Sequence, residues 1–167
     1  MVRVLLPHEP PAHNLLPDFE EIAAGSQQLY GVYRQSGMAP ALRVFAQAVK
    51  LDEHETPFLL QAFDPRSGPY VFSNAQYWFE REILYYPAHK FDVKDFEAHK
   101  EKLILALGEW TDKEAGHHRP NLVLSEKLRL DPVYLPGAHL GFASHPQQFA
   151  SKLIEALKAK DQYFAKI

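Results

Sequence analysis

The sequence predicts an α/β fold in which a small parallel sheet of about three strands carries a large helical insertion. Short apolar runs at residues 2–6, 102–107 and 132–136 are typical of buried strands. For about 90 residues after the first run, apolar side chains recur at helical spacing and no strand pattern interrupts them. Strand and helix then alternate to the end of the sequence, and this order predicts right-handed crossovers and a parallel sheet.

Local signals predict the individual elements. The first run begins at Val2 and ends at Leu6, and the prolines that follow it make residues 8–11 a loop. The second run is apolar on both faces and is closed by Gly108, as expected for a strand with neighbours on both sides. Helical periodicity and capping residues predict helices over residues 18–37, from about 38 to 49, and over 74–85, 93–99, 120–128 and from 146 onward.

Composition excludes several classes of protein. The chain has 167 residues, of which 46% are hydrophobic and 23% charged, which is ordinary for a single globular domain. There is no cysteine, so disulfides, thiolate metal sites and a cysteine nucleophile are excluded. The net charge is −3 without a basic run, and we therefore expect no nucleic-acid or membrane partner. No apolar stretch approaches the ~20 residues of a membrane span, so the sequence favours a soluble cytoplasmic protein.

Ionisable residues follow each predicted strand directly. His8 and Glu9 follow the first strand, Glu109 and Asp112 the second, and His139 the third. Parallel strands bring their carboxyl ends to one edge of a sheet, where ligands bind in open α/β folds. A carboxylate and an imidazole at this edge are expected to form a pair in which the acid fixes the tautomer of the histidine.

Four segments resemble the C-terminal half of α/β-hydrolases. Residues 136–150 read PGAHLGFASHPQQFA and are similar to the PGGHxGxxxxPxxFA motif that carries the catalytic histidine of that superfamily. Residues 8–11 read HEPP, as after the sixth strand in one branch, and residues 105–109 read LALGE, similar to the seventh strand and acid loop. Arg119 and Pro120, with the helix after them, also fit this order.

The resemblance implies a truncated α/β-hydrolase fold in a single domain over residues 1–167. Residues 12–98 would form a helical lid, and residues 1–11 and 99–167 the sheet core. His139 would be the general base. The nucleophile of this superfamily lies in a GxSxG motif before the sixth strand, and the seven serines of this chain lie outside such a motif. The resemblance therefore has an alternative interpretation, in which the chain is a fragment of a serine hydrolase that lacks the half with the GxSxG motif.

Several residues have competing interpretations. Asp112 matches the usual spacing of the acid from the glycine, whereas Glu109 matches the branch with Gly-Glu, and solvated loop carboxylates are the third reading. His8 and Glu9 are candidates for the substrate pocket, with a structural role more frequent in this branch. Aromatic residues are placed in the core or a dimer interface first and in the pocket second, among them Tyr77, Trp78 and Tyr85. A metal cluster of Glu114, His117 and His118 is weaker than a solvated loop, so no cofactor is expected.

The leading expectation is a small hydrolase-like enzyme. It would use His139 with Asp112 or Glu109 as a general base on a mostly apolar, oxygenated small molecule, in epoxide or ester hydrolysis, cyclisation or isomerisation, as in secondary metabolism. The alternative is a non-catalytic binding or scaffold module. The apolar strand at residues 2–6 would leave an exposed sheet edge, which predicts a homodimer through that strand.

Overall fold

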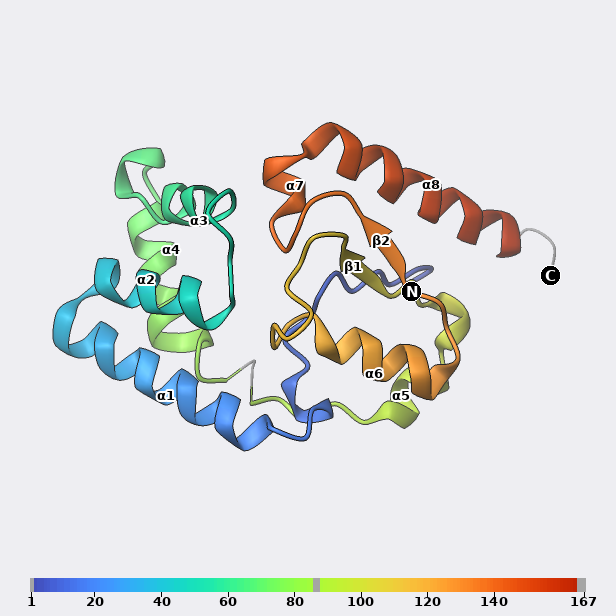
Figure 1. The fold of residues 1–167 in the computed structure, drawn as a ribbon, viewed down its shortest axis with the longest axis horizontal. Helices are drawn as coiled ribbons and strands as arrows, with labels where there is room; N and C mark the ends of the chain where they lie inside the picture. The colour runs from blue at the N-terminus through green and yellow to red at the C-terminus, as the bar shows by residue number, and fades with distance from the viewer. Residues whose placement is uncertain (1, 86–87, 165–167) are drawn as a thin grey trace.

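The computed structural model describes residues 2–85 and 88–164, and it shows a mixed α/β fold in two parts (Figure 1). One part holds a small parallel sheet with helices beside it, and the other is a layer of helices. The elements are, in order, η1 (His13–Leu15), α1 (Phe19–Ser36), α2 (Met38–Ala48), α3 (Thr56–Ala62), η2 (Pro65–Ser67), α4 (Val71–Tyr77), η3 (Trp78–Glu82), α5 (Val93–Glu97), η4 (Lys100–Lys102), β1 (Ala106–Gly108), α6 (Arg119–Leu128), β2 (Val133–Leu135), α7 (Gly141–Ser144) and α8 (Pro146–Phe164).

The sheet is smaller than the sequence indicates. β1 and β2 pair in parallel with Leu107 opposite Tyr134, and the first apolar run joins them only through isolated parallel bridges, Leu5 to Leu103 and His8 to Ala106. Pro7 has no N–H to donate, which limits regular pairing in this segment. The described residues thus contain two strands and a bridging N-terminal segment, so the expected parallel arrangement is confirmed and the third regular strand is not formed.

Asn121 in α6 links the N-terminal segment to β1 through two hydrogen bonds. Its side-chain amide donates to the carbonyl oxygens of Pro7 and Ala106, both at 2.8 Å. Asn121 is fully buried, so these bonds satisfy an NH2 group that would otherwise be costly to desolvate. They fix the segment that delivers His8 and Glu9 to the end of β1.

The helical layer, α1 to α4 with the π-helical turn η3, has a core of its own. Phe79 is fully buried, and its ring stacks on that of Tyr33 at 4.5 Å and meets Trp78 at 4.8 Å. The buried members of this core are Leu29, Ala41, Leu42, Phe79 and Ile83. Separate apolar clusters lie on the two sides of the sheet, one around Leu105 with α6 and one around Leu135 with α8 (Figure 1). The large helical insertion predicted from periodicity is therefore present.

Element boundaries follow the sequence signals closely in most places. Gly37, with φ of 83°, ends α1 and precedes α2, as a glycine in a positive-φ conformation does at helix ends. The helix predicted over residues 74–85 begins earlier, at Val71, and changes to the π-helical turn at Trp78. α3 was not predicted from the sequence. No helix among the described residues is both long and apolar enough to cross a membrane.

Candidate active site

Glu9 lies at the centre of the site, where the N-terminal segment reaches the end of β1. Its backbone φ is 45°, in the left-handed region that residues other than glycine seldom adopt. Its amide donates to the carbonyl of Ala106 at 3.2 Å, and its side chain is directed into the protein, where the residue is 1% exposed. A buried carboxylate needs partners, because burial without them is very unfavourable.

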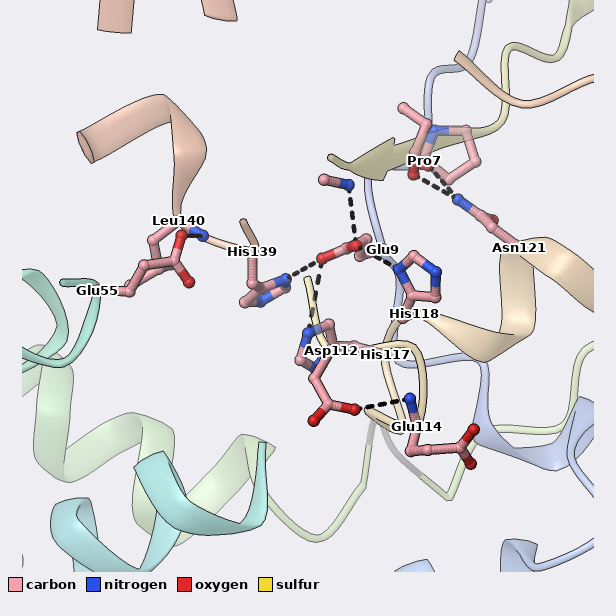
Figure 2. A network of polar contacts seen from close by, with 12 residues as sticks. Pro7, Glu9, Glu55, Asp112, Glu114, His117, His118, Asn121, His139 and Leu140 are labelled. Carbon is pink, nitrogen blue, oxygen red and sulfur yellow. Dashed lines mark hydrogen bonds and ion pairs between the residues drawn. The ribbon is translucent and has the colours of Figure 1, made fainter. Parts of the chain in front are cut away.

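Three donors surround the carboxylate of Glu9 (Figure 2). Oε1 accepts from the amide of Gly108 and from Nδ1 of His118, both at 2.9 Å. Oε2 accepts from Nδ1 of His139, also at 2.9 Å. Nε2 of His117 is 3.6 Å from the same oxygen, close enough for an ion pair if that ring is protonated.

These contacts keep Glu9 ionised. Burial by itself raises the pKa of Glu9, but the hydrogen bonds from His139, Gly108 and His118 outweigh it and lower the pKa to about 2. For two neighbouring imidazoles, those of His8 and His117, a lowered pKa favours the uncharged form instead. Burial lowers the pKa of His8 to about 4, and burial together with the proximity of His139 lowers that of His117 to about 3. Both rings are therefore neutral at pH 7.

His139 connects this buried carboxylate with a pocket. It lies in the loop after β2, two residues after Gly137, whose φ is 92°. A carboxylate only accepts hydrogen bonds, so Nδ1 of His139 must carry a proton, and in this tautomer Nε2 is the nitrogen that can accept one. The side chain of His139 is 30% exposed, and the residue lines the pocket.

The pocket has a volume of about 490 Å³ and lies between the helical layer and the strand-end loops. Its lining is mostly polar, with Leu51, Trp110 and Ala138 as the apolar members. The polar members are Lys50, Asp52, Glu55, Thr111, Asp112, His117 and His139. Seven of the ten lining residues have polar side chains, while the surface that the lining exposes is about half apolar, so the pocket suits a small molecule with both polar groups and apolar parts.

The structure corrects the choice of carboxylate. Asp112 lines the pocket, but its Oδ1 accepts from Nζ of Lys50 at 3.3 Å and from the amide of Glu114 at 2.8 Å. Glu109 has an exposed side chain, and its amide donates to the carbonyl of Leu135. Neither is the hydrogen-bond partner of His139, which pairs with Glu9.

The aromatic residues proposed for the pocket lie elsewhere. Tyr77 and Tyr85 are 60% and 69% exposed, and neither lines the pocket. Trp78 packs within the helical layer against Phe45 and Phe63. Of the pocket candidates that the sequence predicted, His8 and Glu9 lie at the site, and the ring of His8 is stacked 6.1 Å from that of His139.

His117 and His118 are not in a solvated loop. They are 5% and 4% exposed, and both face Glu9, so that expectation from the sequence is wrong. Ligand atoms of Glu9, His117 and His139 lie within 4.8 Å of one another, a spacing that a metal ion can span. In the structure Oε2 of Glu9 accepts a hydrogen bond from Nδ1 of His139, and a metal ion bound by these two atoms would replace that hydrogen bond.

Gly108 permits the close approach of the loops. A Cβ at this position would meet the side-chain oxygen of Thr111 and would lie 2.6 Å from the carbonyl oxygen of Ala138. The loop that carries His139 therefore packs directly on the backbone at the end of β1.

Glu55 was not identified from the sequence. It precedes α3 in the helical layer, yet it is 2% exposed and lines the pocket beside His139. Its Oε1 accepts from the amide of Leu140 at 2.6 Å, a contact across 85 positions of the chain.

No protein-family model matches the sequence.

Proposed function

We propose that this protein is an acid/base enzyme of the hydrolase type in which His139, oriented by Glu9, is the general base. The observation that supports this most directly is the 2.9 Å contact between Nδ1 of His139 and a fully buried carboxylate, with the same imidazole lining a pocket. A general base needs both features, because it must hold one tautomer and reach the proton that it removes.

Glu9 contributes by its charge as well as by its position. When Nε2 of His139 takes a proton, the ring becomes an imidazolium, which the ionised carboxylate 2.9 Å away stabilises. The other oxygen of Glu9 is held by Gly108 and His118, so the carboxylate is fixed before the reaction begins. This preorganisation is what makes an electrostatic contribution effective in a dry site.

The proposed reaction is attack by water, or by a substrate hydroxyl, on an ester or an epoxide. Water loses its proton to His139 as its oxygen bonds to carbon, and the leaving oxygen takes up a proton in turn. The polar lining favours a small oxygenated molecule with more than one polar group. The resemblance of residues 136–150 to the histidine motif of α/β-hydrolases supports the same reaction class.

The test compares His139→Ala with His99→Ala, a histidine on the surface outside the pocket. Turnover of 4-nitrophenyl acetate, phenyl acetate and styrene oxide is measured, with circular dichroism to check folding. We expect His139→Ala to lower kcat/KM about 100-fold or more, and His99→Ala to leave it unchanged. Equal turnover by the two variants contradicts the proposal, and binding without turnover by the wild type favours a binding module.

A further inference from the structure

Glu55 is held at the pocket by hydrogen bonds of its backbone amide and of its side chain. Its amide donates to Oδ1 of Asp52 at 2.7 Å, which fixes the turn before α3. Its Oε1 accepts from the amide of Leu140, the residue next to His139 (Figure 2). The helical layer thus places one carboxyl group beside the general base, although no element of the sheet carries it.

The second oxygen of this carboxyl group lacks a partner among the residues that the structure describes. Oε2 of Glu55 is buried and makes no hydrogen bond with any residue in 2–85 or 88–164. An ionised carboxylate with a bare oxygen is unfavourable in such a place, whereas a neutral carboxylic acid has a hydroxyl that is ready to donate. Burial accordingly raises the pKa of Glu55, against the opposing effect of the Leu140 amide, and nearby Asp52 raises it further.

The surroundings of the two buried glutamates therefore shift their pKa values in opposite directions. Glu9 has three hydrogen-bond donors, which lower its pKa, while Glu55 has one, and burial raises its pKa. Two carboxyl groups whose surroundings drive their pKa values apart are typical of a base side and an acid side in one active site.

We propose that Glu55 is the proton donor of this site and protonates the oxygen that leaves the substrate. The inference depends on the proposed function, because it assigns the partner of the general base. In ester hydrolysis water bonds to the carbonyl carbon and gives its proton to His139. The bond between carbon and the alcohol oxygen breaks, its electron pair stays on that oxygen, and the proton of Glu55 completes the alcohol. The proton on His139 then returns through water to Glu55, so one ester and one water give one acid and one alcohol.

Charged and titratable neighbours of Glu55 will influence its protonation. Asp52 and Lys50 lie on the same segment between α2 and α3. The loops across the pocket bring Glu9, Asp112, His117 and His139.

The sharpest experiment varies the leaving group. A proton donor matters most when the leaving oxygen is strongly basic, so ethyl acetate depends on it more than 4-nitrophenyl acetate does. For Glu55→Gln, which keeps an oxygen to accept from Leu140, we expect kcat/KM to fall about 100-fold with ethyl acetate. The loss with 4-nitrophenyl acetate should be at least tenfold smaller. Glu53→Gln, an exposed neighbour on the same loop, is the matched control and should change neither.

The outcomes separate the two proposals. Equal losses by Glu55→Gln on both esters would make Glu55 a positioning residue only, and no loss would remove it from the reaction. Either result leaves the role of His139 intact, since His139→Ala is expected to impair both esters equally. Full activity of His139→Ala would instead overturn the proposed function itself.

A measurement on the wild type covers the case in which Glu55→Gln does not fold. In protein labelled with ¹³C at the glutamate carboxyl groups, one resonance should titrate clearly above the ordinary glutamate pKa of 4.5. Glu55→Asp removes the labelled glutamate at this position, so this resonance should be absent from its spectrum, which assigns it to Glu55. If every glutamate of the wild type titrates at or below that value, Glu55 is ionised at neutral pH and is not the donor.

Discussion

Replacing Glu9 by glutamine should destabilise the protein by a predictable amount. Glu9→Gln keeps the shape of the side chain but removes the charge that Gly108, His118 and His139 stabilise. The pKa of Glu9 falls from 4.5 to about 2 in the folded protein. At ~1.4 kcal/mol for each pH unit, the ionised carboxylate contributes about 3 kcal/mol to folding at pH 7. The amide of glutamine also has only one accepting oxygen, so its NH2 group must face the N–H groups on one side of the site, either that of His139 or those of Gly108 and His118.

The sign with pH distinguishes this effect from a packing defect. A carboxyl group whose pKa is lowered by folding contributes fully above pH 4.5, and its contribution is lost as the pH falls towards 2. The difference in unfolding free energy between wild type and Glu9→Gln should therefore be about 3 kcal/mol at pH 7 and should shrink steadily below pH 4.5. For a chain of this length, 3 kcal/mol corresponds to a fall of roughly 6–12 °C in Tm.

The assay is urea unfolding followed by circular dichroism at pH 7, 5 and 3, with Glu109→Gln as the control. Glu109 is an exposed glutamate beside the same strand end, and its replacement should change stability by less than ~0.5 kcal/mol. A loss below ~1 kcal/mol for Glu9→Gln at pH 7 would refute the reasoning, as would a loss that is the same at all three pH values.

Four further predictions concern other parts of the molecule. The unfolding free energy should fall as the pH drops below 6.5, because the pKa values of His8 and His117 are lowered to about 4 and about 3 and the unfolded chain takes up protons first; urea midpoints at pH 8 and 5.5 check this. Phe79→Ala should cost about 3–5 kcal/mol and Tyr77→Ala less than ~0.5, since the first side chain is fully buried and the second is 60% exposed; thermal melts compare them. Dialysis against EDTA should leave turnover unchanged, and a loss that zinc restores would instead assign the glutamate and histidine cluster to a metal. Light scattering should give twice the 19.1 kDa chain mass for the wild type and the mass of a single chain for Leu5→Lys, because Leu5 is 47% exposed on the N-terminal segment. A monomeric wild type would contradict the predicted homodimer.

Sequence patterns predicted the elements whose signals are local. The apolar stripe and cap that predict residues 18–37 correspond to α1, and the run closed by Gly108 contains β1. The same reasoning predicted that an imidazole and a carboxylate meet where the strands end, because parallel topology brings those ends together. It missed α3, which is only seven residues long and has too few turns to show periodicity.

The identity of the carboxylate depends on three-dimensional detail that spacing does not contain. Glu9 reaches His139 because its backbone adopts a left-handed conformation and turns the side chain inward, whereas Asp112 faces Lys50. Glu55 joins the site only through a contact with Leu140, 85 positions away. Glu55 is one of three acidic residues in positions 52–55, and nothing in a single sequence distinguishes the one that makes such a contact.

The lack of a side chain at Gly108 has a consequence for how the protein responds to substitution at this position. No larger group fits between the end of β1 and the carbonyl of Ala138, so even an added methyl group would push these two chain segments apart. Their separation determines where the imidazole of His139 lies relative to Glu9. Position 108 should therefore behave in a saturation screen like a reacting residue, although it supplies no functional group beyond its amide. Genetic intolerance here would report on spacing and not on chemistry.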